Sequence, residues 1–182
     1  MSTTSRDRAN WTAVKTKLEP LSPPALITLV HDLYRASPEN RRFLHARLLG
    51  PHLELAKYRQ LVSDAVFPDP FSSRSVRVGE AQRLIRHYRQ ATGDVPGTVE
   101  LLLTFVEAGT EQAADLGYED ERYFAALERA LDTAVALAPD LPSDRRRELL
   151  RRVRRLAERA SAVGWGYGDY VGEVAADLGP SA

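Results

Sequence analysis

The stretch LSPPALITLVHDLYRASPENRRFLHARLLG, residues 21–50, decides the fold class because it contains two helix starts of the same design. In Ser22-Pro23 and Ser37-Pro38, the hydroxyl can accept a hydrogen bond from a free amide of the first turn. The proline takes the first helical position, where its missing N–H costs nothing. Apolar residues follow each start at helical spacing, and Gly50-Pro51 ends the second helix. The stretch predicts an antiparallel helical hairpin.

Helical periodicity continues through the rest of the chain. The further helices are expected at about 11–19, 52–66, 80–92, 97–116, 119–138, 143–162 and 169–178, with Ser143 and Asp169 as the N-caps of the last two. No run of alternating apolar and polar residues is long enough to predict a strand. The sequence therefore predicts an all-α fold of eight or nine helices, packed as antiparallel helical hairpins in an irregular solenoid-like or bundle arrangement.

The length of 182 residues suits a single domain, 1–182. Its one clear break is the loop FPDPFSSRSVRVG, residues 67–79, which separates N-terminal helices (1–66) from C-terminal helices (80–182). Phe67, Phe71 and Val76 are expected to pack this loop against the core.

The composition of the chain limits which partners and which cellular location are expected. Acidic and basic residues balance at 25 each, so no overall charge draws the molecule to nucleic acid or to an anionic membrane. The chain has no cysteine, and its first residues lack the apolar run of a secretory signal. No window approaches the length of apolar sequence that spans a bilayer. We therefore expect a cytoplasmic protein that does not enter membranes.

Several segments together carry a resemblance to a known family. They are LSPPALITLVHDLY, SPENRRFL, VGEAQRLIRHYRQATGD, LLLTFVEAGTEQAADLGYEDERYFAAL and GWGYGDY, with Glu107, Gly117, Tyr123 and Phe124 in the most distinctive block. Over most of residues 21–170 the chain resembles an uncharacterised bacterial domain-of-unknown-function family of small all-helical proteins. The resemblance implies that the domain is a single unit and implies no activity.

The helix expected at 143–160 is rich in arginine. It holds eight arginines against three acidic residues, a local charge of +5, so the remainder of the chain carries −5. Its apolar residues form one face, and most of the arginines spread around the opposite half. Three interpretations stay open: a solvated amphipathic helix, a surface for a protein partner, or a nucleic-acid contact.

The helix expected at 97–116 carries an acidic face. Glu100, Glu107, Glu111 and Asp115 lie within about 80° of arc at helical geometry. Such a stripe can be solvated, or Glu107, Glu111 and Asp115 can hold a divalent metal. The matched charges of +5 and −5 suggest a third alternative. The stripe would then face the arginine helix, within one molecule or across a dimer.

The turn GWGYG, residues 164–168, is the remaining motif. It lacks the preceding strand and the spacing of a phosphate-binding loop. We expect Gly164 to end the arginine helix with a positive φ. Trp165 and Tyr167 are expected either to fold back on the core or to line a groove for a peptide.

Catalytic patterns are not found in the sequence. The four histidines are scattered, and no metal-binding histidine pair or nucleophile elbow occurs. We therefore expect a non-enzymatic helical adaptor or regulatory module without a cofactor, binding another protein or a second copy of itself. The expected partner-binding residues are Arg151, Arg152, Arg155, Trp165 and Tyr167. The alternatives are a nucleic-acid-binding protein using helix 143–160 and a metal-dependent enzyme using the acidic face of helix 97–116.

Overall fold

The computed structural model describes residues 10–69, 71, 75–117, 120–164 and 166–179. These residues form nine α-helices and one short 3-10 helix, with no strand among them. The predicted all-α fold is confirmed for this part of the chain. None of the described helices combines the length and the apolar character needed to cross a bilayer.

The chain divides into two compact units, Met1–Leu44 and His45–Ala182. The first contains α1 (Trp11–Leu18), α2 (Pro23–Ala36) and the start of α3 (Pro38–Leu48), within which the division falls. The second contains α4 (Pro51–Val66), α5 (Val78–Thr92), α6 (Val95–Leu116), α7 (Glu121–Ala136), η1 (Ala138–Asp140), α8 (Ser143–Ala160) and α9 (Tyr167–Asp177). The loop at 67–79 therefore lies inside the second unit and not at a boundary between the units.

The helices of the first unit begin where the sequence predicts. The Ser22 hydroxyl accepts a hydrogen bond from the Ala25 amide at 3.4 Å, and the Ser37 hydroxyl accepts one from the Asn40 amide at 3.0 Å. Among the described residues of α1 and α2 none is buried. Local capping therefore accounts for these helices, and their packing as a hairpin stays a prediction.

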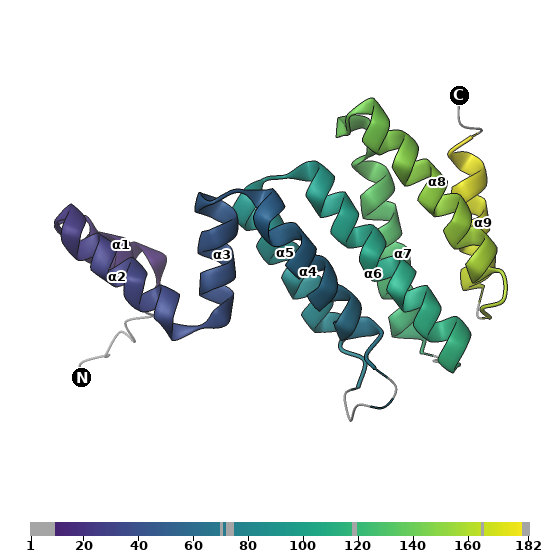
Figure 1. Ribbon diagram of the computed structural model, residues 1–182, viewed down its shortest axis with the longest axis horizontal. Helices are drawn as coiled ribbons and strands as arrows, with labels where there is room; N and C mark the ends of the chain where they lie inside the picture. Colours follow the sequence, from purple (N-terminus) through teal and green to yellow (C-terminus); the bar gives the residue numbers. More distant parts are fainter. Residues whose placement is uncertain (1–9, 70, 72–74, 118–119, 165, 180–182) are drawn as a thin grey trace, which may run out of the picture. The chain divides into compact units, whose positions relative to one another are not determined.

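Helix α6 forms the centre of the second unit. Of its 22 residues, 13 are buried, and it packs against α4, α5, α7 and α8. Figure 1 shows α4, α6 and α8 side by side. The Asp94 carboxylate caps α6 by accepting from the Gly97 amide at 3.1 Å and also accepts from the Tyr88 hydroxyl at 2.6 Å. The helix ends at Gly117, as predicted.

Helix α9 closes the second unit against α7 and α8. The Tyr170 hydroxyl donates to the Asp132 carboxylate of α7 at 2.5 Å. On α8, Leu149, Val153, Leu156 and Ala160 are buried, which is the apolar face that the sequence predicts.

Four local predictions are wrong. Ser143 does not cap α8, because it is already the first helical residue and Pro142 holds the cap position. Asp169 does not cap α9, which begins two residues earlier. The positive φ near the GWGYG turn belongs to Gly166 (73°) and not to Gly164. Phe71 is 99% exposed, while Phe67 and Val76 pack against the core as expected, because an apolar side chain in a loop is buried only if the backbone turns it inward.

Gly168 permits the close approach of α9 to the end of α8, and this generates a prediction. A Cβ at Gly168 would lie 2.6 Å from the Ala160 carbonyl oxygen and 3.1 Å from that of Val163. Because both contacts are backbone atoms, Gly168→Ala should lower the free energy of unfolding in urea by about 1–3 kcal/mol.

Gly172 provides the matched control on the same helix, since a Cβ there would meet nothing within 4 Å. Gly172→Ala should leave the free energy of unfolding unchanged or raise it by up to about 1 kcal/mol, because alanine favours helix. Equal effects of the two substitutions would contradict the packing of α9 against α8.

Candidate functional site

The acidic face of α6 lies against the arginine-rich helix α8. The Arg152 guanidinium lies between two carboxylates of α6: its Nε and Nη2 donate to Glu107 at 2.7 and 2.6 Å, and its Nη1 donates to Glu100 at 2.5 Å. The fork-to-carboxylate geometry with Glu107 is the bidentate arrangement that arginine favours. Of the three alternatives for the acidic face, pairing within one molecule is the one that the structure shows.

Arg152 belongs to the interior of this contact. Its side chain is only 10% exposed, and burial alone would lower the pKa of its guanidinium. The hydrogen bonds and charges of Glu107 and Glu100 outweigh burial, so the pKa is raised. Glu100 also forms an ion pair with Arg59 of α4, whose Nε lies 3.0 Å from its Oε1. One carboxylate on α6 therefore joins α4 and α8.

The other two acids of the face pair with Arg159 near the end of α8. Arg159 donates to Asp115, and its Nε lies 3.9 Å from Glu111. Each of the metal-ligand candidates Glu107, Glu111 and Asp115 thus has a guanidinium beside it, which a bound cation would have to displace. Within the described ranges no group of three or more His, Asp or Glu side chains is arranged to hold a metal ion.

An open cleft of about 790 Å³ runs between α6 and α8. Its lining contains six arginines and five acidic residues, with Leu156 as the apolar member of the described set. Because the charges nearly cancel, the cleft floor is an ion-pair network that holds the helices together. The chemistry that it offers a ligand is electrostatic, since the described lining residues include no histidine and no hydroxyl.

Arg151 and Arg155 of the cleft rim continue onto the exposed surface of α8, where the charge balance is different. Arg147, Arg151 and Arg155 are spaced by four residues, so their side chains follow one another along about 12 Å of one face. We call these three residues the arginine stripe. Arg151 and Arg155 are 65% and 70% exposed and share a single acid, Glu148. The hydrogen bond from Arg151 lowers the pKa of Glu148, which keeps that carboxylate ionised.

The predicted partner-binding residues fall into three groups. Arg151 and Arg155 lie on the arginine stripe, whereas Arg152 is held beneath it by Glu100 and Glu107. Tyr167 is buried in the core. Trp165 lies outside the described residues. The structure therefore does not bring the five together on one surface. The sequence prediction also passed over Arg147, although its spacing of four from Arg151 was visible.

Tyr167 is a core residue and not part of a groove. Its hydroxyl lies 2.8 Å from the Thr110 hydroxyl, which donates its own hydrogen to the Val106 carbonyl at 2.8 Å, so Tyr167 is the donor. Its ring packs on Phe124 with centroids 5.2 Å apart. Burial raises the pKa of its phenol. Tyr167 thus fixes the start of α9 against α6 and α7.

Comparison with models of protein families, with curated proteins and with solved structures gave no match for this chain.

The Arg152 contact generates a prediction about stability. Arg152→Gln leaves two partly buried carboxylates facing one another without their shared cation. The free energy of unfolding should fall by about 2–4 kcal/mol in urea denaturation, toward the lower end because Glu100 and Glu107 stay partly solvated.

Arg151→Gln is the control, since it removes an exposed arginine of the same helix. It should change the free energy of unfolding by no more than about 0.5 kcal/mol. If both substitutions cost the same, the contact between α6 and α8 does not hold the two helices together.

Proposed function

We propose that this protein is a cytoplasmic, non-enzymatic adaptor or regulatory module that binds an acidic segment of another protein along α8. The observation that carries the proposal is the arginine stripe. Three exposed arginines follow one another on one helix face, and a single glutamate lies between them. A surface of one charge attracts a partner of the opposite charge and orients it.

Other arginines of α8 are held by contacts within the fold, which supports the arginine stripe as the binding surface. Arg146 donates to the carbonyls of Ala138 and Pro139, and Arg159 pairs with Asp115. With Arg152 in the ion-pair network below, these side chains are used in holding the fold. Arg147 has no ion pair among the described residues, and Arg151 and Arg155 share one acid, so the stripe keeps a net positive charge.

Two features favour a protein over nucleic acid as the partner. No described aromatic side chain is exposed on α8 to stack with bases, and the stripe spans only about two helical turns. The first unit also presents large apolar side chains: Trp11 and Ile27 are 69% and 70% exposed. Exposed apolar groups of this kind are typical of protein interfaces, either with a partner or with a second copy.

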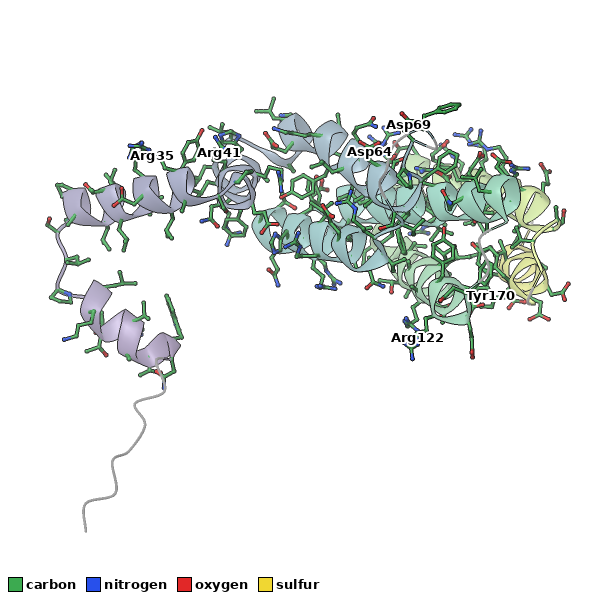
Figure 2. All side chains as sticks on the ribbon, turned by 90° about the horizontal axis from the view of Figure 1, so that it is seen from below. Arg35, Arg41, Asp64, Asp69, Arg122 and Tyr170 are labelled. Atoms are coloured by element: carbon green, nitrogen blue, oxygen red, sulfur yellow. The ribbon has the colours of Figure 1, made fainter. Side chains whose placement is uncertain are left out.

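The proposal predicts charge-dependent binding of an acidic peptide. In fluorescence-anisotropy titrations with a short labelled poly-L-glutamate peptide, Arg151→Glu/Arg155→Glu should weaken binding by roughly tenfold or more, because two charge-assisted contacts are lost. Arg122→Glu is the matched control, since Arg122 projects from α7 without a described partner (Figure 2). It should leave binding within about twofold of the unaltered protein.

A capture experiment from the source cells extends this test to the natural partner. A protein with an acidic segment should be retained by the unaltered chain and by the Arg122→Glu variant, and lost from the Arg151→Glu/Arg155→Glu variant. The proposal is wrong if the two variants behave alike, or if nuclease treatment removes whatever is bound. Light scattering on the purified protein shows whether the partner is a second copy.

A further inference from the structure

A second hollow lies on the opposite side of α6 and differs from the α6–α8 cleft in its chemistry. Its volume is about 260 Å³. Helix α6 supplies the floor, and α5 and α7 supply the walls. Thr98, Leu102 and Phe105 line it from α6, about 150° around that helix from the acidic face. We call it the α5–α7 hollow.

The bottom of the hollow is apolar. Its lining includes Ile85 of α5, Leu102 and Phe105 of α6, and Ala126 and Ala130 of α7. All five are core residues that pack with one another, so the shape is fixed by the fold.

Besides Gln82 of α5, the uncharged polar residues of the lining are Thr98 and Thr133, and both hydroxyl groups already have partners. The Thr98 hydroxyl donates to the Asp94 carbonyl and the Thr133 hydroxyl donates to the Arg129 carbonyl, each at 2.7 Å. The inner part of the hollow therefore offers little to a sugar or another ligand with many hydroxyl groups. It suits a group without polar atoms.

Three arginines surround this apolar bottom. Arg86 and Arg89 come from α5 and Arg129 comes from α7. Within the described part of the chain, none of the three guanidinium groups has a hydrogen bond or an ion pair, and no acidic residue is among the described lining residues. In the α6–α8 cleft, by contrast, five acids offset six arginines.

This uncompensated charge is the observation that points to a ligand. The three arginines are exposed residues of two helices that line one hollow, and like charges around one hollow repel unless neighbouring acids offset them. The Asp132 carboxylate of α7 instead accepts a hydrogen bond from the Tyr170 hydroxyl of α9. An anion bound from solvent would supply the missing negative charge, and arginine forks match carboxylate and phosphate oxygens.

We propose that the α5–α7 hollow binds an amphipathic organic anion, with its anionic head between Arg86, Arg89 and Arg129 and its apolar part on the floor. The volume corresponds to roughly nine water molecules, so the apolar part has about eight to ten non-hydrogen atoms. A medium-chain carboxylate is the simplest molecule of this class. The site is separate from the arginine stripe and does not depend on the function proposed for it.

The isoleucines of the chain provide a direct test, because there are only two. Ile85 lines the hollow and Ile27 lies on α2 in the first unit. In methyl NMR of protein labelled at isoleucine, titration with octanoate should shift the Ile85 signal to saturation and leave Ile27 in place. Acetate supplies the head alone and 1-octanol the tail alone. Each should bind roughly tenfold or more weakly than octanoate.

Variants assign the binding to the hollow. Arg86→Gln/Arg129→Gln should weaken octanoate binding by roughly tenfold or more, since two charge-assisted contacts are removed. Ala130→Leu keeps the charges but fills the floor, and it should abolish the Ile85 shift. Arg122→Gln on α7 and Arg151→Glu/Arg155→Glu on α8 should leave binding unchanged. Because Ile27 belongs to the first unit, it cannot report on these variants; an unchanged cooperative unfolding transition in urea shows in each case that the second unit is folded.

Several outcomes would overturn the proposal. One is an unmoved Ile85 signal at millimolar octanoate. Another is equal binding of 1-octanol and octanoate, which would make the contact merely apolar. A third is a shift of Ile27 as large as that of Ile85, which would mean detergent-like binding. The proposal also fails if poly-L-glutamate shifts Ile85 and octanoate does not, since the occupant would then be a peptide.

Discussion

Burial of α6 is the constraint on which the rest of the second unit depends. A helix packed by four others has little solvent-facing surface along most of its length, so a partly buried charge there, such as that of Glu100, needs a partner from a neighbouring helix. The acids of α6 meet Arg59 of α4 and Arg152 and Arg159 of α8. The apolar residues of α6 define which helices lie next to it, and its acids define how α8 is placed along it.

This constraint divides the arginines of the protein by role. Arginines next to the acids of α6 form ion pairs within the fold, and Arg152 among them is nearly inaccessible to solvent. Arginines on the outer surface of α8 stay accessible to solvent, as Arg151 and Arg155 do. On the opposite side of α6, the described lining of the α5–α7 hollow contains no acid, and Arg86, Arg89 and Arg129 surround apolar side chains instead. The same residue type thus serves as a fold contact, a surface charge and a component of a candidate anion site.

Much of the fold could be predicted because its signals are local. A serine before a proline determines a helix start whatever surrounds it, and Gly93 and Gly117 end helices at the expected residues. The acidic face of α6 could also be predicted, since it follows from helical spacing alone. Its pairing with α8 was one of three alternatives, because balanced charge indicates attraction without showing which surfaces come together.

The individual site residues could not be predicted to the same extent. In the sequence, Arg151 and Arg152 are adjacent arginines in the same helix, and nothing local separates them. One turns outward and the other meets two glutamates more than forty residues earlier in the chain. Tyr167 likewise could have lined a groove, and its burial depends on Thr110 and Phe124.

The sequence by itself determined the helices, their capped ends and the presence of opposite charges on two of them, since each of these depends on neighbours within about four residues. Tertiary structure decided which arginines pair with carboxylates inside the fold and which stay accessible on the surface. It also created the α5–α7 hollow. The physical reason is distance: a guanidinium is neutralised by whichever carboxylate lies within a few ångströms, and only the packed helices bring those groups together.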